Sequence, residues 1–269
     1  MKYNWLLSVA LIFSFFSGSL YGHTLVISDI DDTIKNSFVL DKMEMVENTF
    51  KSDVPFKGMA ELYNILKAKN PTTEFVYLSN ALDFISETSH RTLLLKGHFP
   101  EGRLILRKSL TDKKHKLRVI TKLILDEKPD KVILIGDNGE SDVSIYDQVK
   151  KLFSDLNIIV AIHTVYNSGG SNNKGAALFV DQVPFVTAID LSQEFLNLDL
   201  ISLEHFQIFA AFYVNHLQNE KASIHGSFVL PLWVRCSDFV LKSTTVSNAS
   251  EIHPLLSDYY SFLVSRCSY

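Results

Sequence analysis

Five short runs of apolar, mostly β-branched residues recur along the first two thirds of the chain, and each has the length of a buried β-strand. These runs are residues 24–28, 75–78, 104–106, 132–135 and 158–162. Segments with apolar residues at helical spacing lie between them, at residues 59–66, 117–124 and 143–152. Strands that alternate with helices need crossover connections. The pattern therefore predicts an α/β, doubly wound fold with a mainly parallel, five-stranded sheet and helices on both faces.

The alternation of strands and helices is expected to stop near Asp190, beyond which the pattern is helical over residues 202–219 and again near the end of the chain. We therefore expect a catalytic core at residues 23–192 and a mostly helical extension at residues 193–269. Residues 206–214 are almost all apolar, which favours a buried helix; docking on a membrane is the alternative.

The N-terminal segment has the pattern of a secretory signal peptide. Lys2 precedes an apolar run over residues 5–16, and small residues follow at residues 17–19 and at Gly22. An apolar run of about a dozen residues is shorter than the ~20 residues that a membrane-spanning helix needs. We therefore expect residues 1–22 to be a cleaved signal peptide, the protein to be exported to the periplasm or secreted, and the mature chain to have no transmembrane span.

Composition and charge narrow the range of partners. The chain of 269 residues has a formal net charge of −4 and no block rich in lysine and arginine, so a nucleic-acid partner is not expected. A local basic cluster lies at Lys113, Lys114 and Lys116. The two cysteines, Cys236 and Cys267, either pair in an oxidising compartment or remain as buried thiols.

Polar residues follow the predicted strands at the points where the strands end. Ligands of doubly wound sheets bind in the crevice at the carboxyl ends of the strands, so these side chains are the candidate site. They are Asp29 and Asp31 after the first strand, Ser79 and Asn80 after the second, Asp137 after the fourth, and Asp142 at the start of the next helix.

The four carboxylates of this set predict a metal site. Carboxylates that converge on one pocket repel one another and tend to be protonated unless a cation lies among them. Hard oxygen ligands suit Mg²⁺, which binds one or two carboxylates together with a substrate phosphate. A calcium-binding EF-hand loop starting at Asp29 is excluded, because Ile34 and Leu40 occupy the positions of its glycine and its terminal glutamate.

Four motifs in this order resemble the haloacid dehalogenase superfamily: the segment Asp29–Thr33, a serine after a strand, a lysine at the start of a helix, and the segment Gly136–Asp142. Residue by residue, segments 28–34 and 135–146 resemble the phosphatidate phosphatase catalytic domain typified by the yeast actin-patch protein. This resemblance covers roughly residues 25–163. It departs from the family pattern after Asn80, where alanine and leucine replace a serine and a proline, and at Asn138, where the family favours serine.

The resemblance implies roles for the residues of the first motif. Asp29 would be the nucleophile that forms an aspartyl-phosphate, and Asp31 would protonate the leaving oxygen and then deprotonate the attacking water. Thr33 would fix the loop that surrounds the phosphate. Ser79, with the backbone amide of Asn80, would bind a phosphate oxygen.

The remaining motifs would supply positive charge. Lys116 would neutralise the phosphoryl group and Asp29, with Lys114 as the alternative lysine. Asp137 would ligate Mg²⁺ directly, and Asp142 would bind the ion or its waters, so that the expected metal site consists of Asp29, Asp31, Asp137 and Asp142.

The short intervals between the motifs leave room for only a minimal cap. Residues 34–56 are expected to form a flap, and an open pocket of this kind admits a bulky or interface-bound substrate. The leading hypothesis is an exported Mg²⁺-dependent phosphatase of a lipid phosphate such as phosphatidate. The alternatives are a phosphatase of soluble phosphomonoesters or phosphoproteins, and a non-catalytic module that binds metal or anions.

Overall fold

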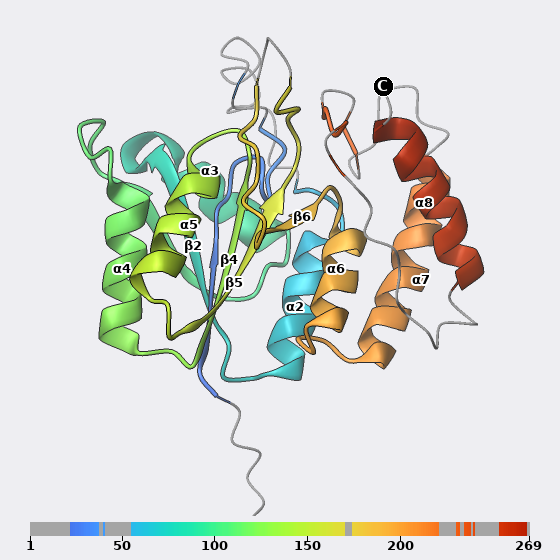
Figure 1. Ribbon diagram of the computed structural model, residues 1–269, viewed down its shortest axis with the longest axis horizontal. Coiled ribbons are helices and arrows are strands. Elements are labelled where there is room, and N and C mark those ends of the chain that lie inside the picture. The colour runs from blue at the N-terminus through green and yellow to red at the C-terminus, as the bar shows by residue number, and fades with distance from the viewer. Residues whose placement is uncertain are drawn as a thin grey trace, which may run out of the picture.

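The computed structural model describes residues 22–37, 40, 55–169, 174–220, 230–231, 234–237, 239 and 253–267. Within these residues a six-stranded, fully parallel sheet has the strand order β3-β2-β1-β4-β5-β6 (Figure 1). The strands are β1 Thr24–Ser28, β2 Glu74–Leu82, β3 Arg103–Arg107, β4 Lys131–Asp137, β5 Asn157–His163 and β6 Val183–Phe185. The predicted α/β fold is confirmed, and the sheet has one strand more than expected. Strand β6 has only three residues, which is too short to show a period.

The order of the strands makes the sheet doubly wound. From β1 the chain proceeds outward to β2 and β3, then returns to β4 on the other side of β1 and proceeds outward again. Helices α4 and α5 cover one face, and helices α2, α3 and α6 cover the other (Figure 1). These helices are α2 Met59–Lys69, α3 Asp83–Lys96, α4 His115–Glu127, α5 Asp142–Leu152 and α6 Ala188–Asn197.

Strand β1 shows why the sequence forms a sheet that is covered on both faces. All five of its residues are buried, and its apolar side chains alternate between two cores. Leu25 and Ile27 pack in the core beneath α4 and α5, whereas Val26 packs in the core beneath α2 and α6. A strand with both faces buried is apolar along its length, which is the pattern that identified it.

The alternation continues one unit further than the sequence pattern indicated. Helix α6 follows β6 and extends past Asp190, where the alternation was expected to stop. Asp190 itself belongs to a capping box with Thr187, in which each side chain bonds the backbone N–H of the other. The position at which the alternation was expected to stop is therefore the N-terminal cap of another core helix.

Two further helices form an outer layer beyond α2 and α6 (Figure 1). They are α7 Leu203–Glu220 and α8 His253–Cys267. Phe206, Phe209 and Tyr213 of α7 are buried, whereas Ile208 is 63% exposed, so the helix buries one face of this apolar run. Cys236 and Cys267 form a disulfide that joins the segment before α8 to the end of α8. None of the helices described is long and apolar enough to cross a membrane.

Two expectations from the sequence lie largely outside the described residues. The predicted signal peptide is described only at Gly22. The predicted flap over residues 34–56 is described only at residues 34–37, 40, 55 and 56. The division of the chain at residue 192 also stays a prediction.

Candidate active site

The site lies at the carboxyl ends of β1 and β4, the two neighbouring strands at which the winding direction reverses. Asp29 directly follows β1, and its backbone N–H donates to the carbonyl of Ile135 on β4 at 2.8 Å. Asp137 is the last residue of β4, and Asp142 is the first residue of α5. All three aspartates are buried, so the doubly wound topology brings together carboxylates that are more than 100 positions apart in the chain.

Lys116 joins two of these carboxylates. Its Nζ donates to Asp29 Oδ1 and to Asp142 Oδ1, both at 2.6 Å. The lysine lies in the first turn of α4 and is 1% exposed. Lys114, the alternative from the sequence, is an exposed residue that precedes the helix. The structure therefore places Lys116 at the site.

The charges of this cluster do not balance within the chain. Carboxylate oxygens of Asp29, Asp137 and Asp142 lie within 4.8 Å of one another, and a single ammonium group, that of Lys116, lies among them. Burial raises the pKa of Asp29 and of Asp137, and the neighbouring carboxylates raise both further. Burial alone lowers the pKa of Lys116, but the charges of Asp142 and Asp29 raise it well above its ordinary value. Lys116 is therefore an ammonium, and it compensates at most one of the three carboxylates, so the other two require protons or a further cation.

The remaining oxygens of the cluster suit a hard divalent cation. Asp142 Oδ2 is buried and has no hydrogen-bond partner among the residues that the structure describes. Gly136 permits this position, because a Cβ atom on it would overlap the carboxylate of Asp142. Asp137 Oδ1 accepts hydrogen bonds from the N–H groups of Gly139 at 2.5 Å and Glu140 at 3.3 Å, which orient its carboxylate. Buried oxygen ligands with excess negative charge fit Mg²⁺.

The loop after β1 is a tight turn that orients the carboxylate of Asp29. The carbonyl of Ile30 accepts from the N–H groups of Ile34 at 3.0 Å and Lys35 at 2.9 Å. Asp32 adopts a left-handed conformation with φ of 58°, which a short polar side chain tolerates better than a branched one. Thr33 Oγ1 then donates to Asp29 Oδ2 at 3.1 Å, so the threonine contacts the expected nucleophile directly.

Asp31 faces a different environment from Asp29, although the two are only two residues apart. Its side chain is 23% exposed, and Ser37 Oγ donates to its Oδ1 at 2.7 Å. His90 Nε2 lies 3.4 Å from Oδ2, and Lys35 Nζ lies 3.9 Å from Oδ1. Burial opposes ionisation, but His90, Lys35 and Ser37 together lower the pKa of Asp31 well below its usual range. The two carboxylates are thus driven in opposite directions, as acid–base pairs in active sites often are.

Ser79 and Asn80 lie at the carboxyl end of β2, beside this group. Ser79 Oγ donates to Asp31 Oδ2 at 3.3 Å and accepts from the N–H of Ala81 at 2.9 Å. Asn80 Nδ2 donates to Glu140 Oε2 at 3.2 Å, which links the end of β2 to the loop before α5. The structure therefore brings every candidate residue from the sequence to one edge of the sheet.

Four further residues shape the site and were not assigned roles there from the sequence. Lys35 and His90 are buried beside Asp31, and the Tyr166 hydroxyl donates to Asp32 Oδ2. Asn138, which departs from the family pattern, has a visible role: its Oδ1 accepts from the N–H groups of residues 165 and 166, at 3.1 Å and 3.0 Å, and its Nδ2 donates to the Tyr166 carbonyl at 2.6 Å. A serine hydroxyl would have to make all three bonds from one oxygen on a shorter side chain, whereas the asparagine amide makes them from two separate atoms. The motif position drew attention to Asn138, and Lys35 lies only four residues after Asp31, whereas His90 and Tyr166 lie far from the motifs they contact.

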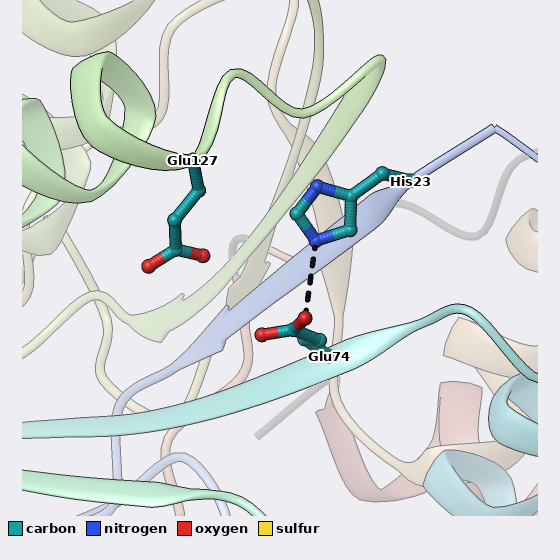
Figure 2. Close-up of side chains that lie close together, drawn as sticks. All are labelled: His23, Glu74 and Glu127. Carbon is teal, nitrogen blue, oxygen red and sulfur yellow. Dashed lines mark ion pairs between the residues drawn. The ribbon is translucent and has the colours of Figure 1, made fainter.

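A second group of possible metal ligands lies at the opposite edge of the sheet. His23 precedes β1, Glu74 begins β2 and Glu127 ends α4 (Figure 2). His23 Nε2 lies 3.6 Å from Glu74 Oε1. Arg103 compensates both carboxylates, because its guanidinium donates to Glu127 at 2.6 Å and 2.9 Å and lies 3.6 Å from Glu74. This group is an exposed ion-pair network.

Comparison with known proteins gives matches over the part of the chain from β1 to β5. Residues 24–164 match the family described as phosphatidate phosphatase APP1, catalytic domain. The chain is 31% identical over 166 residues to phosphatidate phosphatase APP1 of Saccharomyces cerevisiae, in a match that covers 56% of this chain and 27% of that protein. It is 27% identical over 160 residues to an uncharacterized protein of Schizosaccharomyces pombe, covering 52% of this chain and 25% of that one. The matches thus span about a quarter of the length of these relatives.

Among solved structures, the chain is similar to one chain from the structure of the Pnkp1/Rnl/Hen1 RNA repair complex. The sequence identity is 15% and the TM-score 0.37, over 52% of this chain and 43% of that one. A likeness of this size carries no argument about function.

Proposed function

The chain belongs to the family of the phosphatidate phosphatase APP1 catalytic domain, and we propose that it is a phosphatase that hydrolyses a phosphate monoester, with phosphatidate as the first candidate substrate. The observation that carries this proposal is the contact of Lys116 with both Asp29 and Asp142 beneath the end of β1. Phosphoryl transfer needs an in-line nucleophile and neutralisation of the equatorial oxygens, and this cluster offers both. The order of its motifs also supports a place in the haloacid dehalogenase superfamily.

In the proposed reaction, Asp29 Oδ attacks phosphorus and the bond from phosphorus to the leaving oxygen breaks, which leaves an aspartyl-phosphate. Lys116 neutralises charge that would otherwise repel the incoming phosphate, and Thr33 fixes the orientation of the attacking carboxylate. Ser79 is positioned to donate to a phosphate oxygen once its bond to Asp31 is exchanged.

Asp31 is proposed to transfer the protons. It protonates the departing alkoxide in the first step and removes a proton from the attacking water in the second, so that inorganic phosphate leaves and both aspartates are restored. In the free protein the neighbours of Asp31 favour its carboxylate form. A phosphate dianion beside Asp31 adds negative charge, which opposes that effect and favours the protonated form required for the first step.

Mg²⁺ is the proposed cofactor, because the charges of the buried carboxylates are uncompensated and their free oxygens are hard ligands. Asp29, Asp137 and Asp142 are the residues that would hold the ion, whereas the carboxylate of Asp31, the fourth ligand expected from the sequence, lies outside this group of three and faces Lys35 and His90. When bound, the ion would neutralise negative charge on the transferring phosphoryl group. Export is proposed as well, and the Cys236–Cys267 disulfide supports an oxidising compartment.

The decisive experiment measures phosphate release by the purified protein from phosphatidate and from a panel of soluble monoesters, with Mg²⁺ and with a chelator. Asp29→Asn should lower turnover at least about a thousandfold, because an amide is a poor nucleophile. Asp155→Asn, the same chemical change at an exposed position, is the matched control and should leave turnover unchanged.

The pattern of substrates separates the candidate functions. If the protein hydrolyses soluble esters but not phosphatidate, its substrate would be a soluble phosphomonoester or a phosphoprotein. Unchanged Mg²⁺-dependent release by Asp29→Asn would overturn the catalytic assignment, and the absence of turnover on every ester would favour a non-catalytic module.

A further inference from the structure

Three large apolar side chains are exposed beside the mouth of the active site. Phe84 and Ile85, in the first turn of α3, are 78% and 55% exposed, and Leu110, in the loop between β3 and α4, is 66% exposed. Exposed aromatic and branched side chains of this size are costly in water when they gather in one place, and such places commonly mark a contact with another apolar phase. We refer to Phe84, Ile85, Leu110 and the basic residues beside them, Lys108, Lys113 and Lys114, as the docking edge.

The two halves of the docking edge are neighbours in the fold. Helix α3 begins where β2 ends and the loop begins where β3 ends, and β2 and β3 are adjacent parallel strands. Both halves therefore leave the sheet at its carboxyl edge, the edge of the active site. Asp83 and Glu87 of α3 line one shallow hollow together with Lys108 of the loop, which shows that the two halves adjoin.

The docking edge is also tied closely to the catalytic groups. Phe84 is four residues from Asn80, and Lys114 is two residues from Lys116. An extended chain advances at most ~3.6 Å per residue, so each half lies within about 15 Å of a residue of the site. A surface seated on this edge would therefore be within reach of the crevice.

Charge gives the docking edge a preference for an anionic partner. Lys108, Lys113 and Lys114 are exposed, and within the described part of the chain none of them lies within ion-pairing distance of a carboxylate. Two of the nearby acidic side chains are paired, Asp112 with Arg118 and Glu87 with Arg91, whereas Asp83, among the described residues, accepts only from the N–H that follows it and keeps its charge. The three lysines exceed this one carboxylate, so the edge has a net positive charge.

We propose that the docking edge seats the protein on an anionic lipid surface, with Phe84, Ile85 and Leu110 inserted at the boundary between headgroups and acyl chains. Apolar insertion and lysine attraction to anionic headgroups are each weak alone and act together in peripheral membrane binding. This inference rests on the proposed function, because docking on a membrane would supply the route by which a lipid phosphate reaches the active site. Only a minimal cap is expected over that site. Most aromatic side chains of the apolar run in α7 are buried, and Ile208, which is 63% exposed, has no basic cluster of lysines beside it in the sequence.

Sedimentation with phosphatidylserine vesicles tests the proposal, because this lipid is anionic but carries no phosphate monoester for the active site. Two edge variants are compared with the wild type: Phe84→Ser with Leu110→Ser, and Lys108→Glu with Lys113→Glu. Each pair of substitutions should weaken vesicle binding at least about tenfold. Loss of Phe84 and Leu110 removes apolar area from the membrane contact, and each lysine near the surface contributes several-fold to binding. Binding of the wild type should also fall as salt is raised, because the attraction is screened.

Helix α3 offers matched controls at its other end. Leu95 is 77% exposed, as Phe84 is, and lies 11 residues away, or about 16 Å along the helix. Leu95→Ser and Lys96→Glu should leave vesicle binding unchanged. Turnover of a soluble monoester should be the same in all variants, whereas turnover of phosphatidate in vesicles should fall only in the edge variants.

Several results would overturn the docking edge. They are wild-type protein that does not bind phosphatidylserine vesicles, edge variants that bind as the wild type does, and an equal loss in the Leu95→Ser control. Vesicle binding that depends on the edge in a protein that hydrolyses no ester would leave the docking edge standing while the proposed function failed. If the docking edge instead binds a protein surface, the wild-type protein would not bind phosphatidylserine vesicles.

Discussion

At the scale of single residues, the site depends on a buried ammonium group more than on any one carboxylate. Lys116 is surrounded by groups that each cost free energy when buried alone, and its two 2.6 Å contacts compensate that cost. Its neighbour in the sequence, Lys114, has the same chemistry and lies in solvent. The difference is the phase of the first turn of α4, which directs one lysine toward the sheet.

Replacing Lys116 by methionine should lower stability as well as activity. The change leaves the buried carboxylates of Asp29, Asp137 and Asp142 without their cation, and loss of one partner of a buried pair costs about 3–5 kcal/mol. Urea unfolding at neutral pH measures this as a lower midpoint. Lys122→Met is the control, because Lys122 pairs with Asp126 on the surface of the same helix and should contribute less than about 1 kcal/mol.

Addition of Mg²⁺ allows a second unfolding measurement on the same variant. If the ion binds among these carboxylates, it should raise the unfolding midpoint of both proteins, since a ligand of the native state stabilises it by mass action. Equal midpoints for Lys116→Met and wild type, with or without Mg²⁺, would show that the cluster is not electrostatically strained.

At the scale of elements, the junction of α6 and α8 joins the outer helices to the sheet. The Tyr259 hydroxyl of α8 donates to Asp190 Oδ1 at 2.8 Å and contacts the hydroxyl of Thr187. Asp190 Oδ2 accepts from the N–H groups of Val186 and Thr187, at 3.1 Å and 2.9 Å. Burial raises the pKa of Asp190 to about 6, although these donors oppose the shift. The contact therefore joins the N-terminal cap of a core helix to the extension.

Tyr259→Phe should destabilise the protein by about 1–2 kcal/mol, and more at pH 8 than at pH 5. The folded pKa of Asp190 is raised, so its contribution to stability is present below its ordinary pKa of 3.8 and is lost as pH rises through about 6. Removal of the Tyr259 donor penalises the ionised carboxylate most, which enlarges the loss at higher pH. Urea unfolding at the two pH values measures the difference.

The control for this prediction is Asp190→Asn, in which the group no longer titrates. In that background the effect of Tyr259→Phe should be the same at both pH values. A destabilisation of Tyr259→Phe that is independent of pH in the protein with Asp190 intact would show that the carboxylate does not titrate in this range.

At the scale of the whole molecule, one disulfide links two segments of the C-terminal extension, residues 193–269, and the sheet contains no cysteine. The Cys236–Cys267 disulfide joins residues 31 positions apart and lies in the outer layer formed with α8 (Figure 1). Next to this disulfide, the N–H of Arg235 donates at 2.8 Å to the carbonyl of Val165, whose own N–H bonds Asn138. The cysteines themselves belong to an apolar cluster and not to the candidate site, so loss of the disulfide is expected to affect stability more than chemistry at the sheet.

Replacing both Cys236 and Cys267 by serine should lower the free energy of unfolding by about 3 kcal/mol, chiefly because the unfolded chain regains the entropy of an open loop. Reduction of the wild-type protein should have a similar effect on the urea midpoint, whereas a reducing agent should not affect the double variant. Turnover per folded molecule should be unchanged in both. A midpoint that does not respond to reduction would contradict a stabilising role for this bond.

The sequence by itself determined the fold class, and it predicted the residues that the structure brings to one edge of the sheet. Strands such as 24–28 and 132–135 are apolar on both faces because helices cover both sides of the sheet. The runs of apolar residues along the chain therefore indicate the layers of the fold. Asp29, Asp137 and Asp142 were predictable because the topology of parallel strands brings their carboxyl ends to one edge. The pattern failed at β6 and α6, where a three-residue strand and a helix cap resemble the end of the core.

Only the tertiary structure decided which groups compensate the charges of the site. Lys116 and Lys114 differ only in the direction of their side chains, and that direction depends on how α4 packs on the sheet. His90 and Tyr166 contact the first motif from distant positions, so no spacing in the sequence predicts them, and Lys35, although only four residues after Asp31, reaches it through the tight turn between them. The chemical identity of a site resides in short motifs, whereas its protonation, its charge balance and its access to a surface depend on distances between segments that become neighbours only on folding.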